Sequence, residues 1–289
     1  MQRNQKEKRK RSRAQVQDRI GTILLLVVFV VGLSVMLYPT VSDWWNKRVS
    51  TKAIKNYDAI VEEIDEADYT AYFEAAEAYN ESIVKIGSYD TIVAPELLEN
   101  YEDTLDVTGT GIIGYVTIEK INVNLPIYHG TSSAALQAGA GHLEGTSLPI
   151  GGESTHSVIV GHRGLPSAKL FTDLDQMEVG DTFTITVLDQ VYTYEVDQIS
   201  IVLPTEIEEL YVVDGKDYCT LMTCTPYGVN SHRLLVHGVR VDNTESGILH
   251  VTAEAYQIDV IIVATVTAVP LLLLLLIGLL IFTRRQKKK

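Results

Sequence analysis

The sequence predicts an all-β domain, an antiparallel barrel or sandwich, that follows an α-helical segment and is flanked by two transmembrane helices. Two long apolar runs without charge lie near the two ends of the 289-residue chain. An acidic stretch with helical spacing follows the first run. Short segments rich in Val, Ile, Thr and Tyr, separated by Gly, Pro or acidic turns, fill most of the remaining sequence.

The apolar runs are long enough to cross a bilayer. The first contains 18 uncharged residues from position 20, and the second contains 23. Because about 20 helical residues span a hydrocarbon core, we expect transmembrane helices at residues 20–38 and 260–282. A cleaved signal peptide is the alternative for the first run. The sequence that follows it, "MLYPTVSDWW", has no Ala-x-Ala-like cleavage site, which favours an uncleaved anchor.

Basic tails next to the two runs predict the orientation of the chain. Residues 1–19 contain eight Lys or Arg against two acids, and residues 283–289 end in "RRQKKK". Lys and Arg beside a span remain on the cytoplasmic side. We therefore expect two cytoplasmic tails and an extracellular middle region. The tails carry +6 and +5, so a net charge of −13 leaves −24 for the rest. This charge disfavours nucleic acid as a partner, and the tails are better suited to the lipid surface.

Residues 39–108 form the predicted helical segment. Apolar residues recur there at helical spacing with acids between them, namely Tyr57, Ile60, Val61 and Ile64. We expect one or two amphipathic helices. Two roles remain open for this segment: a spacer that holds the next domain away from the membrane, or a regulatory element.

Residues 109–242 form the predicted β domain, and residues 243–259 link it to the second apolar run. About 130 residues are enough for one such core. The segments "DTFTIT" and "VYTYEV" flank Leu188-Asp189-Gln190 and predict a hairpin. The segment "DYCTLMTC" predicts a strand that ends in a thiol.

The two cysteines, Cys219 and Cys224, are not expected to form a disulfide. On one strand, a separation of five residues places the sulfurs roughly 16 Å apart and on opposite faces. A disulfide requires Cα atoms within about 7 Å. We therefore expect Cys219 to be a small core residue and Cys224 to be a free thiol. An exported free thiol is liable to oxidation, so its presence suggests a function. Cys224 is therefore a candidate nucleophile.

A thiol nucleophile needs a proton-transfer partner, and histidine is the usual one. His162 stands apart from the other six histidines because it follows the apolar strand "SVIV" within Gly161-His162-Arg163-Gly164. Polar residues at the end of a buried strand are where a rigid scaffold presents functional groups. The other six are compatible with turns, strand faces or positions near the membrane: His129, His142, His156, His232, His237 and His250.

Arg233 is the third candidate. It opens the segment "RLLVHGVRV", nine residues after Cys224. Two strands joined by "TPYGVNSH" would place both residues at one rim of the domain. A guanidinium does not act as a base, but it can bind a carbonyl oxygen and stabilise the charge that develops on it. A surface charge at the start of a strand is the alternative.

These residues resemble the motifs of the sortases, the cysteine transpeptidases of Gram-positive surfaces. Thr220-Leu221-x-Thr223-Cys224, the downstream Arg233 and the upstream His162 carry the resemblance, which extends over residues 111–241. "INVNLPIYHGTS" and "TLMTCTPYGVNSHRLLVHG" look like the class C, pilus-assembling branch in particular. The two-span topology also fits that branch.

The resemblance implies a closed eight-stranded β-barrel and a mechanism without cofactor or metal. Cys224 would cleave the Thr–Gly bond of an LPxTG-like sorting signal in a pilin or surface protein and keep the acyl group as a thioester. His162 would act as acid and then as base. Arg233 would hold the substrate carbonyl, and the backbone near Thr223 would contribute to substrate binding. A lysine amine of another pilin would release the acyl group.

One departure from the branch concerns its N-terminal lid, which often carries an Asp-Pro-aromatic motif. None of the eight prolines here follows an aspartate. The segment "SYDTIVAPELLENYEDTLD" occupies the expected place without the motif. We expect that no such plug closes this groove.

Three alternatives to pilus assembly remain open at the level of the sequence. A wall-anchoring sortase would use the same residues with a peptidoglycan-precursor amine. A thiol peptidase would use water to release the acyl group. A catalytically silent, membrane-tethered adhesin or scaffold would not need Cys224, His162 and Arg233 together.

Overall fold

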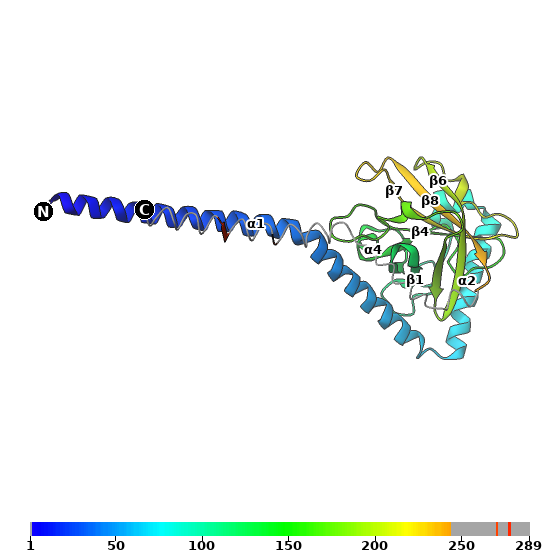
Figure 1. The fold of residues 1–289 in the computed structure, drawn as a ribbon. Coiled ribbons are helices and arrows are strands. Elements are labelled where there is room, and N and C mark those ends of the chain that lie inside the picture. Colours follow the sequence, from blue (N-terminus) through cyan, green and yellow to red (C-terminus); the bar gives the residue numbers. More distant parts are fainter. Residues whose placement is uncertain (1, 244–269, 271–276, 279–289) are drawn as a thin grey trace. The chain divides into compact units, whose positions relative to one another are not determined.

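The computed structural model describes residues 2–243 together with Pro270, Ile277 and Gly278, and side chains from residue 20 onward. The chain divides into two units, one of Met1–Ser42 with Glu254–Lys289 and one of Asp43–Ala253. The second unit contains the barrel (Figure 1). The strands of this unit extend from Ile112 to Val241, within the β domain predicted at 109–242.

The elements follow one another with helices first and strands afterwards. The α-helices are α1 (Gln2–Val61), α2 (Glu66–Ile86), α3 (Ser88–Val93) and α4 (Ser133–Ala138). The strands are β1 (Ile112–Ile118), β2 (Val123–Tyr128), β3 (Ala140–His142), β4 (Thr155–Val160), β5 (Thr182–Val187), β6 (Gln190–Val202), β7 (Asp217–Thr225) and β8 (His232–Val241). Four 3-10 turns are η1 (Pro95–Leu97), η2 (Glu119–Ile121), η3 (Leu174–Gln176) and η4 (Glu208–Leu210).

The eight strands close into a barrel in the order β1-β2-β3-β4-β7-β8-β6-β5. The predicted hairpin is confirmed, because β5 and β6 pair antiparallel around Leu188-Asp189. The expectation of a purely antiparallel sheet is wrong: β2 with β3 and β4 with β7 are parallel pairs. Parallel neighbours require long connections. The link from β4 to β7 contains the whole β5–β6 hairpin, and this long-range pairing left no local signal in the sequence.

α1 contains the first predicted span. One helix that includes residues 20–38 is apolar and long enough to cross a membrane. The second predicted span, residues 260–282, lies outside the described residues except for Pro270, Ile277 and Gly278. The two-span topology therefore stays a prediction. The separation into a span and a distinct amphipathic helix is not observed, because α1 continues unbroken to Val61.

The helical segment packs against the barrel. The fully buried Tyr57 of α1 donates its hydroxyl to the Ile113 carbonyl (3.2 Å) and accepts the Leu188 amide (2.8 Å). Asn80 of α2 exchanges two hydrogen bonds with the backbone of Leu148. α2 also contributes Ala76, Tyr79 and Ile83 to the same buried apolar cluster as the strands. The segment is thus part of the folded domain, not a detached spacer.

Two buried histidines make the stability of this domain sensitive to acid. His142 and His156 are 0% and 1% exposed, and burial lowers the pKa of each to about 4. Because burial disfavours the charged form, both are neutral near pH 7, and in that form one ring nitrogen of each donates to a carbonyl: Nε2 of His142 to Ser147 (2.8 Å), and Nδ1 of His156 to Tyr211 (3.0 Å). Their remaining nitrogens accept from the hydroxyls of Tyr101 and Thr220.

We expect the domain to lose stability as the pH falls from about 6.5, the ordinary histidine value, towards 4. In this window the unfolded chain binds protons that the folded chain does not. Each histidine then costs up to about 1.4 kcal/mol per pH unit. Thermal unfolding of the full chain at pH 7.5 and 5, compared with His156→Gln, measures this effect. The variant should show a smaller difference in Tm, and equal differences would contradict the assignment.

Candidate active site

Cys224 and Arg233 lie opposite each other on neighbouring strands. β7 and β8 pair antiparallel, and their register matches Cys224 with Arg233. Residues directly opposite in such a pair have Cβ atoms about 5 Å apart on the same face. The predicted proximity of these two residues is therefore confirmed.

His162 follows β4, which lies on the other side of β7. The parallel register matches Val160 with Met222, and the Gly161 amide donates to the Met222 carbonyl (3.0 Å). Continued by two residues, this register places His162 beside Cys224. Cys224 and Arg233 thus lie at the paired ends of β7 and β8, and His162 follows the end of the adjacent strand β4. All three side chains are partly exposed.

The two cysteines are separated as the strand geometry predicts. Both are free thiols, Cys219 buried and Cys224 partly exposed. Cys219 belongs to the buried apolar cluster of the barrel, where burial raises the pKa of its thiol well above the ordinary value. A thiol in this environment stays protonated and inert. Of the two, only Cys224 is placed to react with a ligand on the outer face.

Thr223, expected to contribute to substrate binding through its backbone, has a buried side chain. It is 1% exposed, and its hydroxyl donates to the Gly161 carbonyl (2.7 Å). The hydroxyl therefore holds the end of β4 against β7. A contribution to substrate binding would have to come from the main chain.

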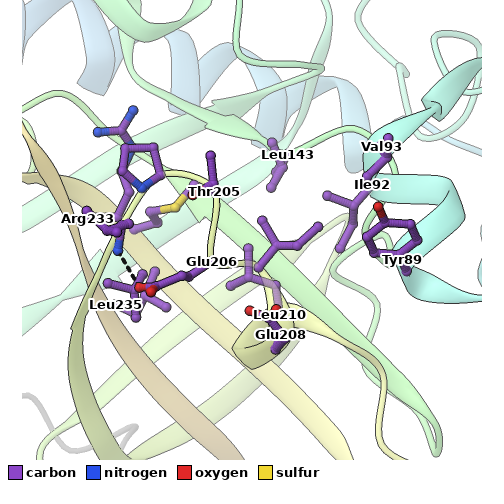
Figure 2. Close-up of a pocket in the computed structure, with 15 residues that line it drawn as sticks. Tyr89, Ile92, Val93, Leu143, Thr205, Glu206, Glu208, Leu210, Arg233 and Leu235 are labelled. Carbon is purple, nitrogen blue, oxygen red and sulfur yellow. Dashed lines mark hydrogen bonds between the residues drawn. The ribbon is translucent and has the colours of Figure 1, made fainter.

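The guanidinium of Arg233 is held by the loop that precedes β8. Nη1 donates to the carbonyls of His232 (3.2 Å) and Asn230 (3.5 Å). Since a guanidinium has five N–H donors, donors remain for a substrate carbonyl. Figure 2 shows Arg233 at one end of a pocket, with the side chains of α3 at the opposite end.

The pocket has a volume of about 460 Å³ and lies on the outer face of the barrel. Its floor includes Met222 of β7 and Leu235 of β8, which are paired with each other. Each lies two residues from Cys224 or Arg233 along its strand, and therefore on the same face of the sheet. The loop between β6 and β7, residues 203–208, forms one side. The pocket is therefore an apolar groove that leads towards the thiol.

α3 forms the far wall of this groove through Tyr89, Ile92 and Val93 (Figure 2). The helix is firmly attached, because the buried Thr91 donates its hydroxyl to the Gly145 carbonyl (2.8 Å). Gly145 has a φ of +88°, and a Cβ there would lie 2.2 Å from the Thr91 carbonyl oxygen. A glycine is required at this contact.

Sequence reasoning did not assign α3 or the β6–β7 loop to the site. The only signal was the position of "SYDTIVAPELLENYEDTLD" where a lid is expected. The structure shows that the first part of this segment is a wall with an open groove beside it. The lining residues of α3 are mainly apolar, and Glu206 and Glu208 of the loop match no motif that the sequence offered.

The other described histidines have structural partners away from Cys224 and Arg233. His129 and His142 contact Tyr101, and His237 pairs with Asp197 through Nδ1 (2.5 Å). Ser231 bonds to His232. His250 lies outside the described residues. Of the histidines, His162 is the one that the register places beside Cys224.

A thiol, an imidazole and a guanidinium in one row beside an apolar groove are suited to acyl transfer. The thiol can attack a carbonyl, the imidazole can move the proton, and the guanidinium can bind the oxygen on which charge develops. Within the described residues, no group of three or more His, Cys, Asp or Glu side chains is placed to hold a metal ion.

Comparison with known proteins agrees with this arrangement. A sortase domain family model matches residues 116–241. The crystal structure of sortase C1 from Streptococcus agalactiae is 50% identical, covers 67% of this chain and all of that chain, and superposes with a TM-score of 0.62. Sortase C1 of GBS pilus island 1 is 45% identical over 68% of this chain and 94% of that chain, with a TM-score of 0.59.

A curated relative is more distant. Sortase A of Streptococcus agalactiae serotype III (strain NEM316) is 33% identical over 129 residues, 44% of this chain and 51% of that protein. The chain thus matches about half the length of this relative. The sortase C1 structures cover more of this chain, 67% and 68% of it. The barrel, the row of three residues and the extent of these matches lead to one conclusion: the chain belongs to the sortase family, the cysteine transpeptidases of Gram-positive surfaces.

Proposed function

We propose that this chain is a membrane-anchored cysteine transpeptidase that polymerises pilin subunits. The proposal is supported by the register of β7 with β8, which matches Cys224 with Arg233, and by the pairing of β4 with β7, because His162 follows β4. The likeness to sortase C1 structures supports the pilus-assembling branch.

In the first half-reaction, Cys224 attacks the carbonyl carbon of threonine in the Thr–Gly bond of an LPxTG-like sorting signal. The C–N bond breaks, His162 protonates the departing glycine amine, and the threonine acyl group remains on Cys224 as a thioester. Arg233 donates to the carbonyl oxygen while charge accumulates there. The residues preceding threonine lie along the apolar groove.

In the second half-reaction, a lysine side-chain amine of another pilin attacks the thioester. His162 accepts the proton, an isopeptide bond forms, and the Cys224 thiol is restored. Because the thioester conserves the free energy of the cleaved peptide bond, no nucleotide is required. A peptidoglycan-precursor amine in place of lysine would give wall attachment by the same steps.

In the proposed topology, this reaction takes place on the extracellular side of the cell membrane. α1 supplies one apolar span, and residues 260–282 are proposed as the second. Both basic tails would then be cytoplasmic, and the catalytic domain would be extracellular. The strongly acidic balance of this domain disfavours nucleic acid, and the basic tails are suited to the lipid surface.

The decisive experiment incubates the full chain in detergent with a purified pilin that carries an LPxTG-like signal. A ladder of covalent multimers, cross-linked through lysine by mass spectrometry, is expected. A single product that forms only with a peptidoglycan-precursor amine would instead identify a wall-anchoring enzyme. Hydrolysed signal without ladder, even with a lysine donor present, would identify a thiol peptidase.

α3 is proposed to bind the sorting signal and not to plug the groove. Ile92→Ala should raise the KM for a sorting peptide about tenfold, because losing roughly two of its three carbon groups from contact with substrate, at about 0.8 kcal/mol each, costs about 1.5 kcal/mol. kcat should change little. Leu97→Ala is the matched control, since Leu97 is half exposed on η1 and does not line the pocket. A gain in kcat/KM for Ile92→Ala would show that α3 blocks the site.

A further inference from the structure

Hydrogen bonds connect the two sequence neighbours of Cys224 with the two sequence neighbours of His162. The Thr223 hydroxyl donates to the Gly161 carbonyl (2.7 Å), and Nη1 of Arg163 donates to the Thr225 hydroxyl (3.1 Å). Two side-chain hydrogen bonds thus flank the thiol and the imidazole. They lie beyond Val160, where β4 ends and the regular ladder with β7 stops.

Arg163 is fixed at both ends of its guanidinium. Nη2 forms an ion pair with Asp175 of η3, while Nη1 binds Thr225. The Arg163 side chain is 10% exposed, and Thr225 is 7% exposed. Burying a charge is costly unless it is paired and hydrogen-bonded. The pair with Asp175 supplies that compensation, so the guanidinium is held between η3 and the end of β7.

The backbone of Gly161 and His162 is also fixed on the side of Phe171. The Phe171 amide donates to the His162 carbonyl (3.1 Å). A Cβ on Gly161 would lie 2.5 Å from the ring of Phe171, so this aromatic ring packs directly on the glycine backbone. Phe171 thus holds the backbone of Gly161 and His162 on the side away from β7. On the side of β7, the hydrogen bonds Thr223–Gly161 and Arg163–Thr225 then set the separation of the imidazole and the thiol.

We propose that Arg163 is a positioning residue for transpeptidation: its bond to Thr225, anchored by Asp175, sets the distance between His162 and Cys224. The inference rests on the proposed function, because it assigns Arg163 a role in the same proton transfer. Proton transfer requires hydrogen-bond reach, and a displacement of about 1 Å can cost roughly a hundredfold in rate. Arg163 itself does not contact the substrate.

The first test uses the full chain in detergent and removes one partner of the Arg163–Thr225 bond at a time. Thr225→Val keeps the shape and removes the hydroxyl, whereas Thr225→Ser keeps the hydroxyl. Thr225→Val and Arg163→Met should each lower kcat for peptide cleavage 10- to 100-fold, with KM changed less than threefold. Thr225→Ser should remain within threefold of the parent.

Arg240→Met is the matched control for the loss of a paired, partly buried arginine. Arg240 lies near the other end of β8, contacts Asp217 through Nε (3.9 Å) and covers the ring of Tyr192. This variant should lose thermal stability without a change in kcat beyond twofold. Tm values of all variants separate a kinetic effect from unfolding. If Arg163→Met fails to fold, the Thr225 pair still tests the proposal.

The second test measures alkylation of Cys224 by iodoacetamide between pH 5 and 9, located by mass spectrometry. Arg163→Met should move the pH profile towards that of His162→Ala. In the His162→Ala background, Arg163→Met should change the alkylation rate less than twofold, because a residue that acts through His162 has no effect once His162 is removed. An additive effect would overturn the proposal, since Arg163 would then act on the thiol directly.

Failure of this inference is distinguishable from failure of the proposed function. Fully active Arg163→Met and Thr225→Val, together with inactive Cys224→Ala, would remove only the positioning role. An active Cys224→Ala would remove the proposed function itself. Loss of activity equal in Thr225→Ser and Thr225→Val would also overturn the positioning role, because the hydroxyl would then be irrelevant.

Discussion

Cys224→Ala is expected to abolish transpeptidation completely and to leave the barrel folded. Without the sulfur there is no atom to form the thioester, and the reaction loses its covalent intermediate. Cys224 is partly exposed at a strand end, so removing the sulfur leaves no closed cavity. The mass of the protein after incubation with a sorting peptide measures the effect: the parent should gain the acyl fragment, and the variant should not.

Cys219→Ala is the matched control for this experiment. Cys219 is fully buried in the barrel on the same strand, and its replacement costs about 1 kcal/mol of stability. It should retain acylation with a slightly lower Tm. If Cys224→Ala still transfers the acyl group to a lysine donor, the mechanism proposed above is wrong.

Arg233→Ala is expected to lower kcat by a factor of about 100 to 1,000 with the thiol intact. A donor directed at a developing oxyanion typically contributes about 3–4 kcal/mol to the transition state. Arg233→Lys keeps the charge and loses the planar fork, so it should recover only part of the rate. Steady-state cleavage of a sorting peptide and single-turnover acylation measure both variants.

Arg240→Ala separates this effect from a general loss of charge on β8. Arg240 is on the same strand, paired with Asp217 at a distance from the groove. It should leave kcat within about threefold of the parent. A normal kcat in Arg233→Ala would show that Arg233 is only a charge at the start of the strand, the alternative that its position in the sequence allowed.

The candidate residues of the site were predicted from local sequence. Cys224 follows a short β segment, and odd spacing on one strand separates it from Cys219; both features depend only on residues within the same segment. The juxtaposition with Arg233 also follows from a short connection, because strands joined by a few residues pair antiparallel. His162 was singled out by its position after an apolar strand, but its proximity to Cys224 depends on the parallel pairing of β4 with β7.

The walls of the groove could not be predicted in the same way. α3 and the β6–β7 loop contribute apolar side chains whose role depends on which distant elements cover them. The contact of Thr91 with Gly145 joins residues 54 positions apart. Nothing in either local sequence marks the other. The extent of the helices was also unpredictable, since α1 runs from the apolar span into the folded domain.

By itself, the sequence determined the classes of element, a candidate nucleophile with its candidate partners, and an apolar run long enough to cross a membrane. These depend on composition, spacing and strand periodicity, which are local properties. Only the tertiary structure decided the strand order, the groove and the bond from Arg163 to Thr225. Such features depend on segments that are distant in sequence, as Arg163 and Thr225 are across 62 positions. Contacts of that kind are selected by the packing of the whole barrel, and no single segment encodes them.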